Sequence, residues 1–99
     1  MNVAKLLQQA QKAQEQMQRG LANLEVEGSA GGGLVRVRLN GLKELKAVTI
    51  DAKALVGEEA TLVEDLVVAA WQEAARLVEE RSRELLASMG LPTGMPGLF

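Results

Sequence analysis

Three basic residues near the N-terminus have a spacing that can form a binding surface. Lys5, Lys12 and Arg19 follow one another at intervals of seven residues. Because two turns of an α-helix return nearly to the same direction, these cations would lie along one line of a helix. Such a line can bind the phosphates of a nucleic acid backbone, and it can also be an ordinary solvated face. The spacing alone leaves both interpretations open.

Two further arginines, Arg81 and Arg83, lie near the end of a second predicted helix, among several glutamates. In the same helix, Arg76 stands four residues before Glu80, a spacing that favours a local ion pair. Arg81 and Arg83 remain candidates for phosphate contacts because they stand close to the projecting helix end.

A second pair of arginines is expected to be neutralised within a sheet. Arg36 and Arg38 alternate with apolar residues, as Glu25 and Glu27 do on the preceding strand. In the register we expect, these glutamates face the arginines directly across the strands, and each such pair contributes roughly 0.2–1 kcal/mol. We therefore favour internal pairing over ligand contact for these two arginines.

The residue types needed for most enzyme chemistry are missing. The chain of 99 residues has no cysteine and no histidine, which excludes Cys and His nucleophiles and His/Cys metal sites. Gly28 and Gly33 have the spacing of a phosphate-binding loop, but Leu34 and Val35 stand where Lys and Ser or Thr are required. We therefore expect no catalytic site, no metal, no cofactor and no small-molecule substrate.

Residues 24–50 predict a three-stranded antiparallel meander. Apolar and polar residues alternate in three segments, a pattern typical of half-buried strands. Gly31–Gly33 provides a first turn in which positive φ angles are readily adopted, and Asn40-Gly41 is a strong hairpin signal for the second. The predicted buried face of the sheet consists of Leu24, Val26, Val35, Val37, Val48 and Ile50.

A helix is predicted on each side of this sheet. Residues 2–22 carry apolar or small residues at a 3-4-3-4 spacing, with good helix formers between them. Residues 58–89 keep helical periodicity, with Gly57 as the predicted N-cap. Residues 90–99, which contain both prolines, are predicted to be a flexible tail. The prediction is a single α+β domain over residues 1–99.

The charge distribution is uneven along the chain. The net charge of −2 argues mildly against a nucleic-acid binder. Residues 1–50 nevertheless carry seven basic against four acidic residues, whereas residues 51–99 carry four against nine. The absence of cysteine and of a long apolar segment predicts a cytoplasmic protein that does not associate with a membrane.

The length of the second helix predicts a homodimer. At 1.5 Å per residue this helix would be about 45 Å long, which is more than a small three-stranded sheet can cover. The apolar residues from Leu77 to Met89 would then need a partner, and Trp71 is predicted to lie in the core or in the same interface. We expect that partner to be a second copy of the chain.

Several motifs occur in a characteristic order. They are the segment Val26–Val37 with its glycine run, Asn40-Gly41, Val48-x-Ile50-Asp51, Glu64–Val67 with Ala69, Ala70 and Ala74, and the tail Leu-Pro…Pro-Gly-Leu-Phe. As an ordered set, together with the Gln- and Met-rich first helix, they resemble the YbaB/EbfC family of bacterial nucleoid-associated proteins. The resemblance covers essentially the whole chain.

This resemblance implies a helix, a three-stranded antiparallel sheet and a long helix, assembled as a tweezer-like homodimer. It also implies non-catalytic binding of double-stranded DNA by helical prongs in the nucleoid. A role in chromosome organisation, gene regulation or DNA repair and recombination would follow. Helical prongs correspond here to the first helix and the end of the last, so the predicted DNA-contacting residues are Lys5, Lys12, Arg19, Arg81 and Arg83.

A different class of function stays open at this point. The chain can also be a dimeric scaffold that binds a protein partner through its exposed helices and its apolar tail. The predicted anchors of such a partner are Leu91, Met95, Leu98 and Phe99. A continuous basic groove in the dimer would favour DNA, whereas an acidic or apolar groove would favour a protein partner.

Overall fold

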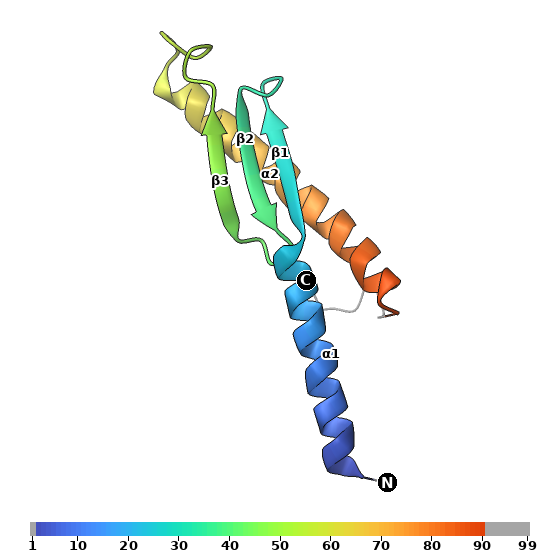
Figure 1. Cartoon of the computed structure of the whole chain (residues 1–99). Coiled ribbons are helices and arrows are strands. Elements are labelled where there is room, and N and C mark those ends of the chain that lie inside the picture. Colours follow the sequence, from blue (N-terminus) through green and yellow to red (C-terminus); the bar gives the residue numbers. More distant parts are fainter. Residues whose placement is uncertain (1, 91–99) are drawn as a thin grey trace.

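The computed structural model describes residues 2–90, which form two helices and one sheet (Figure 1). In chain order the elements are α1 (Val3–Asn23), β1 (Glu25–Ala30), β2 (Val35–Asn40), β3 (Leu45–Ile50) and α2 (Ala60–Ser88). The predicted α+β class, with an antiparallel sheet between a first helix and a long C-terminal helix, is confirmed.

The sheet is an antiparallel meander in the order β1-β2-β3. Val37, in the centre of β2, lies opposite Gly28 of β1 and Val48 of β3. The turn between β1 and β2 is Gly31–Gly33, whose φ angles of 65°, 71° and 96° lie in the left-handed region that glycine adopts readily. The glycine run therefore makes a hairpin turn between two strands, as predicted.

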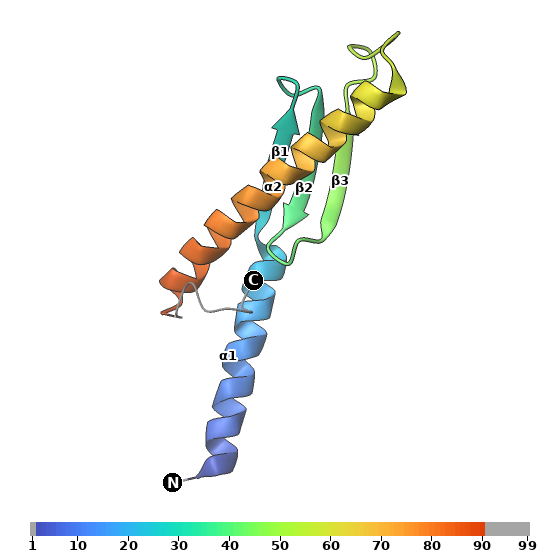
Figure 2. The same cartoon turned by 180° about the vertical axis from the view of Figure 1, so that it is seen from behind.

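Helix α2 lies across one face of the sheet, over β1 and β2 (Figure 2). Its Ala70, Ala74 and Val78 are buried in the same core as Val37. The helix comes so close to β1 that a Cβ atom added at Gly28 would overlap backbone atoms of Ala70 and Ala74. Small residues on both elements thus let helix and strand backbones pack directly against each other.

The third strand is not covered by this helix. Val48 and Ile50 point to the same face as Val37, but 42% and 43% of their surfaces stay exposed. The prediction that both would be buried is wrong, because α2 crosses the sheet over β1 and β2 and leaves the edge strand open (Figure 2). Val26 is buried as predicted, whereas Leu24 is only half-buried.

The turn at Asn40-Gly41 has a different geometry from the one its sequence suggests. The connection from β2 to β3 spans residues 41–44, and its positive φ of 62° belongs to Lys43 rather than to Gly41. A Cβ atom at Gly41 would lie 2.6 Å from the carbonyl oxygen of Leu21. The glycine is therefore needed because the turn closely approaches the end of α1.

Helix α1 extends away from the sheet as a single rod (Figure 1). Residues 2–16 are exposed, and Leu21 is the buried residue of the helix. Asn2 caps the N-terminus, where its side chain accepts a hydrogen bond from the backbone N–H of Lys5. Because α1 projects, the molecule is elongated, with extents of 69 × 19 × 18 Å.

Helix α2 begins later than the sequence pattern indicates. Gly57 has a φ of 84° and belongs to the preceding loop, so the prediction of Gly57 as N-cap is wrong. The N-cap is Glu59, whose backbone is extended and whose side chain makes no capping hydrogen bond. The left-handed φ of Gly57 is one that glycine adopts readily.

Some predictions lie outside the described residues. They are the flexible tail beyond Gly90 and the proposed docking anchors of the scaffold alternative, Leu91, Met95, Leu98 and Phe99. Among the described residues, neither helix combines the length and the apolar character that crossing a membrane requires.

Candidate nucleic-acid interface

The three basic residues predicted to form a line all lie on α1. Lys5 and Lys12 belong to its exposed, projecting part, and neither forms an ion pair with a carboxylate of residues 2–90. Arg19 Nη2 lies 3.6 Å from Glu15 Oε2, but these side chains are 75% and 65% exposed. Water screens such a pair, so it contributes little to stability. All three cations are accessible to a large polyanion.

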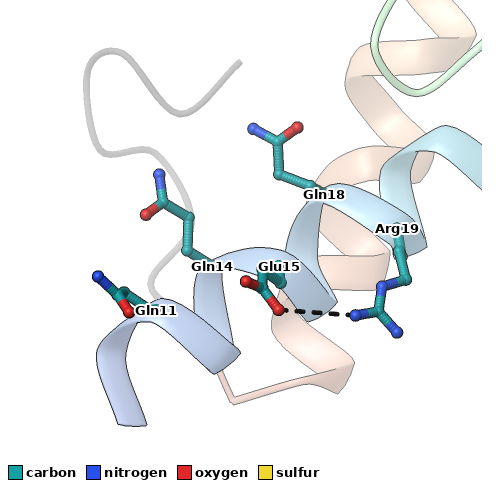
Figure 3. Close-up of a pocket in the computed structure, with 5 residues that line it drawn as sticks. All are labelled: Gln11, Gln14, Glu15, Gln18 and Arg19. Carbon is teal, nitrogen blue, oxygen red and sulfur yellow. Dashed lines mark ion pairs between the residues drawn. The ribbon is translucent and has the colours of Figure 1, made fainter. Parts of the chain in front are cut away.

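An open hollow lies along the C-terminal half of α1 (Figure 3). It measures about 680 Å³ and is lined by Gln11, Gln14, Glu15, Gln18 and Arg19. Its lining within residues 2–90 comes from α1 alone, and the hollow is an open, outward-facing surface rather than an enclosed small-molecule site. Its glutamine amides both donate and accept hydrogen bonds, which suits contact with phosphates or base edges. Within residues 2–90, no group of three or more His, Cys, Asp or Glu side chains is placed to hold a metal ion.

Arg76, in the middle of α2, is engaged by neighbouring glutamates. Its Nη2 and Nε donate to the two carboxylate oxygens of Glu73 at 2.9 and 3.2 Å, and its Nη1 donates to Glu80 at 3.3 Å. The hydrogen bond with Arg76 holds the pKa of Glu73 below its usual value and raises the pKa of Arg76. The predicted pair with Glu80 is confirmed, and two carboxylates together neutralise this guanidinium.

Arg81 and Arg83 stand on different flanks of α2, because two residues span about 200° of helix rotation. Arg83 Nη2 lies 3.9 Å from Glu79 Oε2, and Glu79 also pairs with Lys43 through Oε1 at 3.6 Å. Arg81 lines a small hollow of about 180 Å³ together with glutamates of β1.

Lys5 and Lys12 belong to the half of α1 that projects away from α2 (Figures 1 and 2). The five predicted residues thus form no single cluster.

The outer face of the sheet, opposite α2, carries Arg36 and Arg38. Arg36 Nε lies 3.7 Å from Glu27 Oε1, and Arg38 Nε lies 3.7 Å from Glu25 Oε2, so the predicted pairing is confirmed. The predicted direct opposition holds for Arg38, whose Cα partner is Glu27, but not for Arg36, whose Cα partner is Ser29. Each ion pair is diagonal, and the pairs together neutralise this face.

The two helices differ sharply in charge. Helix α1 carries three basic residues and one glutamate, whereas α2 carries three arginines and six carboxylates. A polyanion is attracted by the first arrangement and repelled by the second. The charge of α1 is therefore complementary to a phosphate backbone.

A second exposed surface is apolar, and the sequence pattern located it poorly. Spare apolar surface is expected from Leu77 to Met89, and Met89 is indeed 38% exposed, but Val78 and Leu86 are only 2% and 0% exposed. Further large apolar side chains are exposed on β3 and on the first half of α2, among them Leu45, Val48, Ile50, Val68 and Trp71.

These exposed residues lie on one side of the molecule. Val68, Trp71, Ala75 and Glu79 recur at spacings of three or four, so they follow one stripe of α2. Glu79 pairs with Lys43, which stands just before β3, so the stripe faces the uncovered edge strand. We call Leu45, Val48, Ile50, Val68 and Trp71 the β3–α2 apolar surface. The spacing of three or four residues along this stripe of α2 is the sequence signal that could have located the β3–α2 apolar surface.

Comparison with known proteins adds an independent observation. A model of the YbaB/EbfC DNA-binding family matches residues 1–94. A nucleoid-associated protein of Xylella fastidiosa (strain 9a5c) is 47% identical over 101 residues, covering 99% of this chain and 92% of that protein. A nucleoid-associated protein of Hahella chejuensis (strain KCTC 2396) is 44% identical over 101 residues, covering 99% of this chain and 93% of that protein.

A solved structure shares the fold as well. The crystal structure of an uncharacterized protein from Helicobacter pylori matches with a TM-score of 0.71 at 27% sequence identity. The match covers 90% of this chain and 97% of that chain, so it includes both helices and the sheet.

Proposed function

Because the chain belongs to the YbaB/EbfC DNA-binding family, we propose that it is a non-catalytic nucleoid-associated protein that binds double-stranded DNA as a homodimer. Contacts from α1 to phosphates provide most of the binding. Such a protein would act in the nucleoid of the cytoplasm, in chromosome organisation, gene regulation or DNA repair and recombination. The observation that carries this proposal is the contrast between a basic, exposed α1 and an acidic α2.

The line of cations on α1 suits a long and regular polyanion. Lys5 and Arg19 are fourteen residues apart, which corresponds to about 21 Å along the helix axis. Duplex DNA presents about one charge per 1.7 Å of its axis, so an aligned helix would pass about a dozen phosphates. Phosphate contacts position a protein without reading bases, so we expect weak sequence preference. Arg81 and Arg83 would only assist, because adjacent carboxylates oppose a phosphate.

The β3–α2 apolar surface supports the homodimer. It joins an unpaired edge strand to a flank of exposed apolar side chains, two features that usually mark an interface. A second copy presents the same surface, so a two-fold arrangement would bury both at once. Two α1 rods would then project from a common centre, giving a tweezer-like shape with twice the number of cations. Sedimentation that finds a stable monomer at micromolar concentration would contradict this assembly.

The DNA proposal is tested by titrating a random-sequence duplex with the protein at several salt concentrations in a gel-shift assay. If each α1 of a dimer contributes three cations, up to six phosphates are neutralised, and log affinity should fall with log salt at a slope approaching about −5. Absence of binding at low salt, or an affinity that salt does not change, would contradict the proposal.

A further inference from the structure

A buried asparagine connects the end of α1 with the turn between β2 and β3. Asn40 is 0% exposed, although asparagine is a residue usually found at the surface. Its Nδ2 donates to the carbonyl oxygen of Ala22 at 3.4 Å and to Glu44 Oε1 at 2.7 Å. Its Oδ1 accepts from the backbone N–H groups of Leu42 and Glu44, both at 3.0 Å. The amide oxygen shapes the turn, while the amide nitrogen reaches the helix.

The next residue strengthens this connection through its backbone. The N–H of Gly41 donates to the carbonyl oxygens of Leu21 at 2.8 Å and Leu24 at 2.9 Å. Those carbonyls belong to the end of α1 and to its C-cap, where the helix has no further backbone N–H groups to donate to them. Leu21 itself is only 4% exposed. The last residue of β2 and the first residue of the following turn therefore satisfy and hold the last turn of α1. We call Asn40, Gly41 and Leu21 the α1 anchor.

Within residues 2–90, helix α1 has little other support. Its residues up to Gln16 are exposed, and near its end Gly20 lies against the side chains of Leu85 and Met89. Lys5 is sixteen residues from Leu21, which makes a lever of about 24 Å. A tilt of about 10° at the anchor would move the position of Lys5 by about 4 Å on such a lever. The direction of the whole rod is thus decided at the α1 anchor.

We propose that Asn40 is a positioning residue for DNA binding, which sets the direction of α1 and so the placement of Lys5 and Lys12. This inference rests on the proposed function, in which α1 supplies the phosphate contacts. A rod held in one direction loses less conformational freedom when it binds than a rod that swings. Asn40 touches no DNA itself and acts through the helix that it holds.

The direction of α1 can be measured in the full chain without DNA. The chain has no cysteine, so Gln8→Cys on α1 and Thr49→Cys on the exposed face of β3 place two spin labels uniquely. The doubly labelled chain is diluted into unlabelled chain, and pulsed electron paramagnetic resonance gives the distance distribution within one protomer. We expect Asn40→Ala to widen this distribution clearly. Asn23→Ala, at the exposed last residue of α1, is the matched control and should leave it unchanged.

DNA binding gives a second readout that separates positioning from contact. Asn40→Ala should weaken the affinity for duplex DNA by about threefold to tenfold, since a swinging helix must be ordered on binding. Its salt slope should match that of the parent, because the same phosphates are neutralised in the bound state. Removing a contacting lysine, in contrast, lowers the slope.

Each outcome of the distance measurement decides the inference. A folded Asn40→Ala variant with the narrow distribution of the parent would overturn it. If Asn40→Ala does not fold, Glu44→Ala decides, because it removes one acceptor of the Asn40 amide from an exposed position. A wider distribution in Glu44→Ala supports the inference, and an unchanged one overturns it. If the parent binds no DNA, the proposed function fails, while the distances still show whether Asn40 directs α1.

Discussion

Helices α1 and α2 are both long, but they are attached to the protein in opposite ways. Helix α2 is buried along most of its length through Ala70, Ala74, Val78 and Leu86, whereas α1 is buried only at Leu21. The well-attached helix is acidic and the projecting helix is basic. Stability and the proposed binding therefore belong to different helices, so a change in one should leave the other property intact.

The largest effect is expected where α2 meets β1. In Gly28→Ala, the new Cβ meets backbone atoms of Ala70 and Ala74, which cannot move aside as a flexible side chain would. We expect the free energy of unfolding to fall by about 3 kcal/mol or more, as measured by urea denaturation. Ser29→Ala, at the exposed neighbouring position, should change it by less than about 0.5 kcal/mol. A Gly28→Ala protein as stable as the parent would contradict the close packing of α2 against β1 at this position.

The next effect concerns assembly rather than folding. Val48→Glu places a carboxylate on the β3–α2 apolar surface at a side chain that is already 42% exposed in the single chain. In a two-fold dimer it would bury two like charges, so we expect the dimer dissociation constant to rise by about 100-fold or more. Thr49→Glu, on the opposite face of β3, is the control for added charge. Equal sedimentation behaviour of Val48→Glu and the parent would place the interface elsewhere.

The smallest effect is expected on α2. Arg76→Gln removes a cation that Glu73 and Glu80 already engage, so the affinity for duplex DNA should change by less than about twofold. Fluorescence anisotropy with a labelled duplex measures this change. A loss as large as that caused by changing the α1 lysines would mean that both helices contact DNA, which removes the contrast between them.

Local features of this fold could be predicted from the sequence. Alternation located the strands, and the glycine run located the first turn, because both depend on neighbouring residues only. The i,i+4 spacing likewise indicated the pair of Arg76 with Glu80. The line of Lys5, Lys12 and Arg19 followed from helical periodicity, although its contact with DNA stays a prediction.

Features that depend on how elements cross could not be predicted in this way. Val48 and Ile50 alternate correctly, yet their burial depends on where α2 crosses the sheet. Gly41 lies in the turn that its sequence indicates, but it is needed for its approach to Leu21, twenty residues earlier in the chain. The role of Asn40 has the same origin, because its partner Ala22 is distant in sequence.

The central claim is that α1 supplies the phosphate contacts, and charge reversal tests it most directly. The variant Lys5→Glu/Lys12→Glu is compared with Lys46→Glu/Lys53→Glu, which has the same net charge and changes two exposed lysines outside α1. Affinity for several duplex sequences is measured at one low salt concentration. We predict that the α1 variant binds every sequence at least about tenfold more weakly, whereas the control loses less than about threefold. An α1 variant that binds as tightly as the parent would contradict the account.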